Sequence, residues 1–272
     1  MIIIDTHVHP YAEDEVRYPP VENPTRPPER TGYISNVERV MKDNGVAKIC
    51  AIQPGTFYKW DNRFICDLSS AERERMAAVC SLDPEDSSSA VRLKQYVREY
   101  GIRGLRSYPS SNGQLDHPGV AELWRACGEA NVVLNVFVDK DKTGELTRLL
   151  ERFSSQPVVI DHCLNLKAGP EMPGVLSEVI RLATFPNTYA KLSFLPGGSA
   201  EEYPFRDLHE ACHKIISAFG ADRCVWGSNF PSELWTPKST YAQHLRLFTH
   251  ELNLPEPAKI AILGGTAQRL WF

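Results

Sequence analysis

Short apolar runs alternate along the chain with longer amphipathic segments. The first run, from Ile2 to Ile4, is β-branched throughout, which suits a strand enclosed on both faces. The longer segments carry apolar residues at helical spacing and end at glycine or proline. Strands are therefore expected at residues 1–9, 46–53, 76–82, 102–107, 132–138, 157–161, 188–193 and 223–227.

The amphipathic segments predict a helix after each of these strands. Their expected positions are residues 35–44, 61–75, 88–100, 118–130, 143–153, 174–183 and 205–219, then 239–252 and 255–263, with a last short turn at 267–270. Eight strands alternating with helices in 272 residues is the count of a (β/α)8 TIM barrel. No linker divides the pattern, so we expect a single domain over residues 1–272.

Polar side chains stand at the carboxyl ends of several predicted strands. Chemistry in a (β/α)8 barrel is found at this end, so the side chains are expected to surround one site. His7 and His9 are two residues apart on one strand and should point to the same side. Such a pair can hold a metal, polarise a carbonyl or move a proton. The full set is His7, His9, Arg106, His162, Lys191 and Asn229.

Two stretches could shape the entrance of this site. Phe57, Tyr58 and Trp60 follow the second strand, where they could line a substrate mouth or simply cover the barrel top. Residues 10–32 contain six prolines and many charges, which is too long and too polar for a simple connection. We expect a binding loop or lid there, and a decorative insertion is the alternative.

Composition excludes several classes of partner. A formal charge of −4 gives no sign of the excess of basic residues that binding to nucleic acid or to an acidic membrane surface requires. No apolar stretch reaches the roughly 20 residues of a membrane helix, and the N-terminal run lacks the features of a secretory signal. The seven cysteines are scattered without Cys-x-x-Cys spacing and are interpreted as reduced side chains of a cytoplasmic protein.

The sequence from His209 to His213 matches His-Glu-x-x-His, the zinc-protease helix signature. The apolar stripe that includes Cys212 and Ile215 marks the buried face of this predicted helix, and the two histidines lie at its flank and beyond it. An outer helix of a barrel also lies away from the mouth. A peptidase role is therefore not expected.

The motifs at the strand ends resemble the amidohydrolase superfamily. They are similar to the branch that holds 2-pyrone-4,6-dicarboxylate lactonase and the sugar-acid lactonases, and they span almost the whole chain. This resemblance implies a TIM-barrel hydrolase that opens a lactone. The motifs are Asp5-Thr6-His7-Val8-His9, Gln53-Pro54, Gly104-Leu105-Arg106, Val159-Ile160-Asp161-His162, Lys191-Leu192-Ser193 and Trp226-Gly227-Ser228-Asn229-Phe230-Pro231.

The chain departs from the superfamily pattern at two places. Metal-dependent members usually carry an Asp where this chain has Asn229, and many carry a His on strand five, where this chain has Asn135 and Phe137. An amide cannot serve as a general base and is a poor zinc ligand. The nearest lactonases of the branch work without a metal. We therefore expect no cofactor, or a weakly held divalent metal (Zn or Mn) with His7 and His9 as its ligands.

These observations predict a hydrolase that opens a lactone or related cyclic ester of a carboxylated small molecule. Water would attack a carbonyl polarised by His7, His9 and His162, and the base would be His162, Asp139 or no side chain at all. The expected substrate is a small anion, and a homo-oligomer is possible. The alternatives are a metal-dependent decarboxylase or hydrolase of the same superfamily and a non-catalytic ligand-binding barrel. The side chains expected to bind substrate are Arg106, Lys191, Tyr108 and Trp60.

Overall fold

The computed structural model describes residues 1–231 and 238–272. Its eight strands form one parallel sheet in sequence order. Beyond the ends of β1 and β8, Val8 pairs with Phe230, and the His9 N–H donates to the Phe230 carbonyl over 2.8 Å. The sheet thus closes into the predicted (β/α)8 barrel. Its strands are β1 (Ile4–Val8), β2 (Lys48–Ile52), β3 (Met76–Ser81), β4 (Gly104–Ser107), β5 (Val133–Val136), β6 (Val158–Ile160), β7 (Thr188–Leu192) and β8 (Cys224–Trp226).

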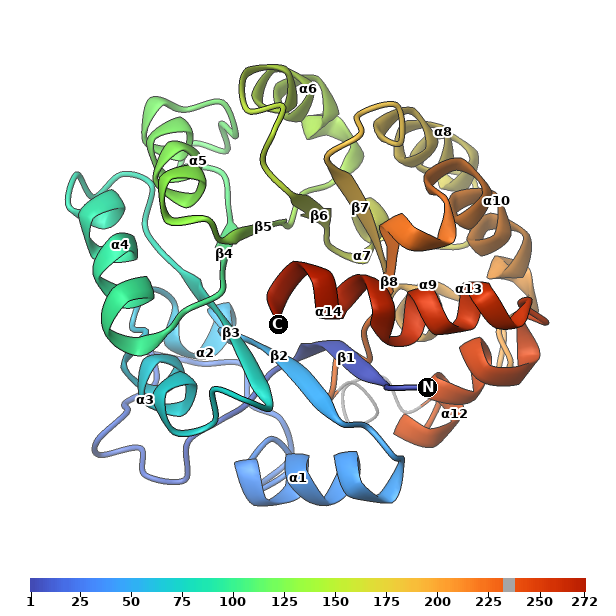
Figure 1. Cartoon of the computed structure of the whole chain (residues 1–272), viewed down its shortest axis with the longest axis horizontal. Coiled ribbons are helices and arrows are strands. Elements are labelled where there is room, and N and C mark those ends of the chain that lie inside the picture. The colour runs from blue at the N-terminus through green and yellow to red at the C-terminus, as the bar shows by residue number, and fades with distance from the viewer. Residues whose placement is uncertain (232–237) are drawn as a thin grey trace.

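Helices follow the strands and form a ring around the barrel (Figure 1). They lie where the apolar spacing predicts them, although the predicted helix at 61–75 is shorter in the structure. Residues 72–75 are mostly exposed and turn back toward β3, so they gain little from helical packing. The helices after β1 to β7 are α1 (Ile34–Asp43), α3 (Arg63–Ala71), α4 (Ser89–Tyr100), α5 (Pro118–Ala130), α6 (Thr143–Arg152), α8 (Met172–Leu182) and α10 (His209–Phe219).

The helix α5 shows how local sequence sets these boundaries. Pro118 occupies its first position, where the missing N–H costs nothing, and the His117 side chain accepts a hydrogen bond from the Gly119 N–H. The helix buries one face, which includes Val120 and Trp124. It ends at Asn131, whose left-handed backbone is a common way to stop a helix.

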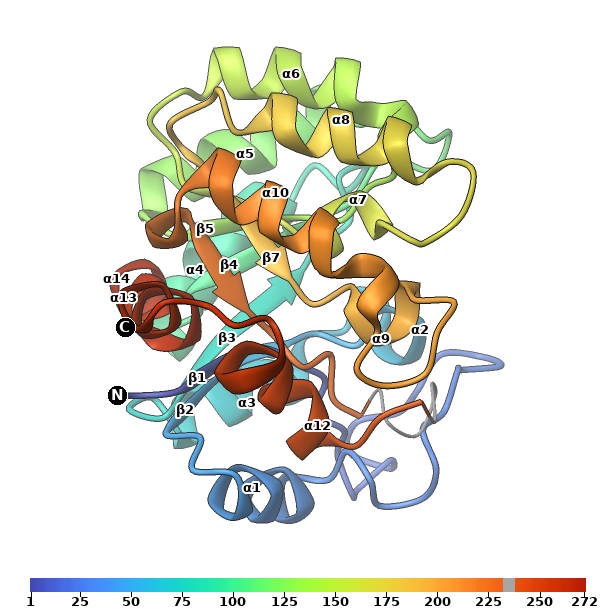
Figure 2. The same ribbon diagram turned by 90° about the vertical axis from the view of Figure 1, so that its right-hand side faces the viewer.

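The C-terminal segment seals the floor of the barrel. It runs through α13 (Glu256–Ile260), a π-helical turn and α14 (Thr266–Trp271), so the short turn expected at 267–270 is a full helix. In Figure 2 this segment lies beside both chain termini at one end of the barrel. Gly264 permits the close approach, because a side chain there would come within 2.2 Å of the Ile2 carbonyl oxygen. Inside the barrel Trp271 packs on the apolar cluster Ile4, Cys50, Ile52, Ala77, Val79, Val133, Val159, Val225 and Ala267.

Beyond β8, α12 (Tyr241–Arg246) continues into a π-helical turn at Leu247–Glu251. Together they account for most of the helix expected at residues 239–252. A capping box starts α12, because the Thr240 side chain accepts from the Gln243 N–H and the Gln243 side chain accepts from the Thr240 N–H.

Three short helical turns that the sequence pattern did not predict follow strands β2, β6 and β7. They are α2 (Gly55–Tyr58), α7 (His162–Asn165) and α9 (Leu195–Gly198). Each is only four residues long, which is too short to produce a periodic apolar pattern. In Figure 2, α2 and α9 lie at the end of the barrel away from α14, so this is the end where the functional site is expected.

Residues 10–32 form no regular helix or strand and lie against α2. The Val21 N–H donates to the Phe57 carbonyl over 2.8 Å, and the Thr25 N–H donates to the Thr56 carbonyl over 3.2 Å. The segment therefore braces the loop after β2. Its role as a lid stays a prediction.

All seven cysteines are buried and free of disulfides. Across residues 1–231 and 238–272, none of the helices combines the length and the apolar character that crossing a bilayer requires.

Candidate active site

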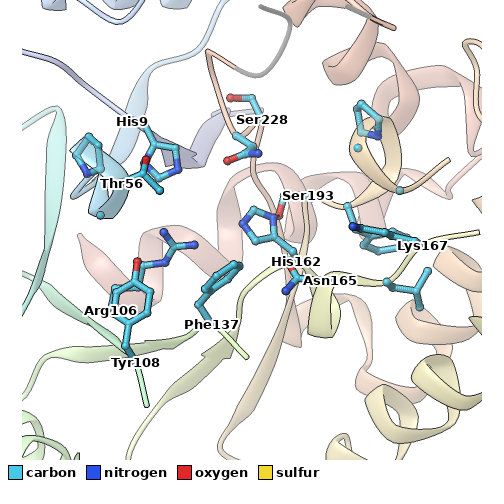
Figure 3. A pocket seen from close by; sticks show the side chains of 18 of the residues that line it. His9, Thr56, Arg106, Tyr108, Phe137, His162, Asn165, Lys167, Ser193 and Ser228 are labelled. Atoms are coloured by element: carbon cyan, nitrogen blue, oxygen red, sulfur yellow. The ribbon is translucent and has the colours of Figure 1, made fainter. Parts of the chain in front are cut away.

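A cavity of about 500 Å³ opens at the carboxyl ends of the strands (Figure 3). This volume suits a small organic molecule. Its walls come from the segments that follow β1, β2, β4, β5, β6, β7 and β8. They include His9, Tyr11, Thr56, Lys59, Trp60, Arg106, Tyr108, Phe137, His162, Asn165, Lys167, Ser193, Phe194, Ser228 and Asn229.

Among the described residues, the charged side chains that line this cavity are all cationic. They are Lys59, Arg106 and Lys167, and the described lining holds no Asp or Glu. Neither Lys59 nor Lys167 forms an ion pair with any residue in the described parts of the chain. In Figure 3 the imidazole of His162 lies between Arg106 and Lys167. Such a cavity favours an anionic ligand with its reacting group near His162.

Arg106 reaches the cavity from β4. Its Nε donates to the Asp161 carboxylate over 3.1 Å, and its guanidinium carbon lies 4.4 Å from the centre of the Phe137 ring. The side chain is 7% exposed, and in Figure 3 the guanidinium points into the cavity. Asp161 holds Nε and the Tyr108 side chain also interacts with the guanidinium, so the N–H groups that remain can bind a ligand carboxylate.

Asp161, at the end of β6, connects the charged groups below the cavity. Its oxygens accept from Lys191 Nζ at 2.8 Å and from Asn135 Nδ2 at 3.2 Å, in addition to Arg106. Burial alone would raise the pKa of this carboxyl, but Lys191 and Arg106 outweigh burial and lower the pKa to about 2. Asp161 is therefore a permanent anion shared by two buried cations.

The imidazoles of His7 and His9 meet as the strand alternation predicts, with their Nε2 atoms 3.1 Å apart. The groups that contact the two outer nitrogens, the Nδ1 atoms, determine which nitrogen of each ring carries the hydrogen. Lys191 Nζ lies 3.3 Å from His7 Nδ1 and can only donate, while the Ile52 carbonyl lies 3.0 Å from His9 Nδ1 and can only accept. Hence His7 carries its hydrogen on Nε2 and donates to His9 Nε2, and His9 donates from Nδ1. Neither ring has an N–H left for a ligand.

All three imidazoles of the site are neutral near pH 7. Burial lowers the pKa of His9 and of His162 to about 3, with Arg106 contributing in both cases, and it holds the pKa of His7 well below its usual range, with Lys191 contributing. Neutral imidazoles next to buried cations act through hydrogen bonds and not as additional positive charges.

His162 is the imidazole with an uncommitted nitrogen. Its Nδ1 lies 2.8 Å from the Ser193 hydroxyl, and its Nε2 has no hydrogen-bond partner among the described residues. The backbone places the ring, because His162 through Asn165 all have positive φ, between 47° and 57°. This left-handed turn is rare for residues with side chains.

Asp5 ties β1 to the loop after β8. Its carboxylate accepts from the backbone N–H groups of His7 at 3.0 Å and Ser228 at 2.8 Å, and from the Tyr241 hydroxyl at 2.8 Å. This connection positions Ser228 and Asn229 at the cavity wall. The amide of Asn229 can orient water there but cannot deprotonate it.

The structure brings most of the predicted site residues to one cavity. His9, Trp60, Arg106, Tyr108, His162 and Asn229 line it. His7 and Lys191 are fully buried beneath it and are absent from the lining. The structure therefore does not support the expected direct contact of Lys191 with substrate or of His7 with a carbonyl.

Several site residues were missed by sequence reasoning. Lys59 and Lys167 follow unpredicted turns and carry no motif signal, whereas Asp161 and Ser193 lie inside quoted motifs and could have been weighed. Asp139, a candidate base, accepts a hydrogen bond from Asn165 over 2.7 Å and is not among the lining residues.

The His-Glu-x-x-His sequence lies on the outer helix α10, as expected. His209 is bonded to the Pro204 carbonyl over 2.6 Å, and His213 is exposed.

The residues that the structure describes do not by themselves complete a site for a tightly held metal. The 3.1 Å between the two Nε2 atoms is close to the roughly 3.3 Å between two tetrahedral zinc ligands. However, catalytic zinc takes three protein ligands, and among residues 1–231 and 238–272 no group of three His, Cys, Asp or Glu side chains is arranged so that it could hold a metal ion. The Nε2 hydrogen of His7 also occupies the position that a metal would need.

A family model described as Amidohydrolase matches residues 4–272. The chain belongs to the amidohydrolase family. Its barrel and its family identify it as an enzyme of the hydrolase type. No curated protein sequence matches the chain.

Solved structures with the same fold include other amidohydrolases. A candidate 2-pyrone-4,6-dicarboxylic acid hydrolase of Pseudomonas putida superposes with a TM-score of 0.82 at 19% identity, covering 99% of this chain and 97% of that one. An amidohydrolase of Burkholderia multivorans with bound zinc superposes with a TM-score of 0.80 at 20% identity, covering 100% of this chain and 99% of that one. The 5-carboxyvanillate decarboxylase of Sphingomonas paucimobilis superposes with a TM-score of 0.69 at 16% identity, covering 99% of this chain and 98% of that one. At these identities the likeness shows the fold alone.

Proposed function

We propose that this amidohydrolase opens a lactone or related cyclic ester of a carboxylated small molecule by water attack. The observation that carries the proposal is a cavity whose charged lining, as far as the structure describes it, is cationic, with one uncommitted imidazole between the cations. Arg106 binds a substrate carboxylate, and Lys59 or Lys167 attracts a second anionic group. Trp60, Tyr108 and Phe137 offer flat apolar surfaces to an unsaturated ring.

In this proposal His162 polarises the carbonyl that reacts. Ser193 donates to Nδ1, so Nε2 carries the hydrogen and donates to the carbonyl oxygen. Negative charge on that oxygen increases as water adds, and the fixed donor stabilises it more strongly than it stabilises the substrate. His7 supports this arrangement from beneath the cavity; His9 lines the cavity but has no N–H left to donate to the carbonyl in this proposal.

The described part of the cavity wall supplies no carboxylate base, and this restricts the substrates that we propose. Water must lose a proton and the ring oxygen must gain one, yet no described Asp or Glu lines the cavity. A lactone whose ring oxygen leaves as a stable enolate needs little help from a general acid, and the proton that the attacking water loses passes to that enolate or to solvent. We therefore propose unsaturated lactones, such as carboxylated pyrones, over saturated esters; a pyrone dicarboxylate is also the substrate type in the name of the Pseudomonas putida neighbour.

Ring opening of matched lactones tests this proposal. A pyrone with two carboxylates, one with a single carboxylate and one with none would be followed by loss of ring absorbance, with product confirmed by mass spectrometry. We expect kcat/KM to fall with each carboxylate removed, and Arg106→Met to abolish the preference. Equal rates on the three compounds would contradict the assignment of the cavity.

The same panel separates the other candidate functions. Release of carbon dioxide would favour a decarboxylase, a candidate that the aromatic lining also accommodates. A carboxylated ligand that binds and is recovered unchanged would favour a non-catalytic binding barrel.

A further inference from the structure

Lys191 is a buried cation that the proposed reaction does not use directly. Its side chain is fully buried, its ammonium pairs with Asp161 at 2.8 Å, and it also lies 3.3 Å from His7 Nδ1. Burying the charged ammonium of a lysine away from water costs free energy. A buried lysine therefore needs hydrogen-bond acceptors or a negative charge next to its ammonium. The carboxylate of Asp161 and the ring nitrogen of His7 are those partners.

The contact with His7 decides which of its nitrogens carries the hydrogen. An ammonium has three donors and no acceptor, so His7 Nδ1 must present its lone pair to Lys191. The hydrogen of the neutral ring is then on Nε2, which faces His9. A metal ion bound by His7 and His9 needs lone pairs on both Nε2 atoms, because metals take neutral imidazole through an unprotonated nitrogen.

We propose that Lys191 keeps divalent metals out of the His7–His9 pair by holding His7 in the tautomer that cannot coordinate them. Moving the hydrogen to Nδ1 would direct an N–H at the ammonium 3.3 Å away and remove one of its two acceptors, leaving only Asp161 among the described residues. The pair then serves as a hydrogen-bonded support, although its nitrogen spacing alone would suit a metal.

Charge reinforces this exclusion. The group around Asp161 already contains two cations, Lys191 and Arg106, against one carboxylate. A divalent ion would add two more charges in a buried region where repulsion is weakly screened. The same excess of positive charge favours the negative transition state of ester hydrolysis, so Lys191 supplies part of the potential that a metal would otherwise provide.

Metal binding without substrate tests this inference independently of the proposed reaction. The variants are Lys191→Gln, whose amide oxygen can accept from His7 Nδ1–H, and Lys191→Met, which removes the donor. Lys167→Met is the matched control, because it removes a cation of the cavity lining without touching His7. Each protein would be stripped with chelator and titrated with Co²⁺, followed by visible absorption, and with Zn²⁺, followed by metal content after gel filtration.

We expect Lys191→Gln to bind Co²⁺ at least about tenfold more tightly than the wild type, with a further gain when Asn229→Asp adds a carboxylate. Lys167→Met should match the wild type, and His7→Ala in the Lys191→Gln background should abolish the gain. Stoichiometric zinc in the wild type that His7→Ala removes would overturn the inference, even if neither Lys191 variant folds. An unchanged affinity in folded Lys191→Gln and Lys191→Met would overturn it as well.

Discussion

Replacing Asp161 by asparagine removes the only carboxylate that Lys191 and Arg106 share among the described residues. Both cations stay buried, and an amide cannot neutralise them. Removing one partner of a buried ion pair costs about 3–5 kcal/mol, so we expect Asp161→Asn to lose that much unfolding free energy at pH 7. The control is Asp139→Asn, an exposed carboxylate, for which we expect a change below about 0.5 kcal/mol.

The pH dependence of the unfolding free energy provides a second measure of what Asp161 contributes. The pKa of Asp161 falls from its ordinary 3.8 to about 2 in the folded protein, which corresponds to about 2 kcal/mol of stability at pH 7. Because the folded-state pKa is the lower one, this contribution is complete above pH 4 to 5 and is lost as the pH falls toward 2. At pH 3 about half of it remains, so the difference between wild type and Asp161→Asn should shrink there.

Urea unfolding followed by far-UV circular dichroism at pH 7 and pH 3 measures both quantities, with unchanged m-values as the sign that the variants unfold alike. The double variant Asp161→Asn with Lys191→Met removes one of the two unbalanced charges and should recover at least about 1 kcal/mol. A loss below about 1 kcal/mol at pH 7 in Asp161→Asn, or no recovery in the double variant, would refute this account of the buried charges.

Four further predictions concern activity. His162→Ala should abolish turnover, and retention of more than about a tenth of the rate would remove His162 from the mechanism. Arg106→Lys should reduce kcat/KM for carboxylated lactones by about 10²-fold with little effect on neutral ones, because the bidentate contact is lost; a uniform loss would indicate a structural role. Since the pKa values of His9 and His162 lie near 3, kcat should be flat from about pH 5.5 to 8, and an inflection near 6.5 would contradict the neutral imidazoles. Asn229→Asp should raise the hydrolytic rate or the metal content, and a variant unchanged in both would argue against placing Asn229 at the reacting water.

The barrel was predictable from the sequence because each element carries its own local signal. Apolar runs and helical spacing locate the strands and helices, and the carboxyl-end rule then gathers His9, Arg106, His162 and Asn229 at one cavity. The convergence of His7 on His9 also follows from strand alternation, which the 3.1 Å separation of their Nε2 atoms confirms.

Depth within the barrel was not predictable in the same way. Lys191 and Arg106 both lie at carboxyl ends of strands, yet one is buried beneath the cavity and the other lines it. The difference arises from the stagger of neighbouring strands and from Asp161, which holds both cations, and neither feature has a signature in one sequence. Lys59 and Lys167 were missed because they follow four-residue turns that leave no periodic pattern.

The left-handed turn that carries His162 limits how this part of the protein can be stabilised by substitution. The positive φ destabilises each of the residues 162–165 by about 1–2 kcal/mol, and glycine would avoid most of this penalty. Cys163 and Leu164 are buried in the core, however, and removing a buried leucine side chain costs about 2–5 kcal/mol, which is more than glycine would return. A laboratory selection for thermostability should therefore retain both side chains, and the backbone turn that orients the imidazole would persist with them.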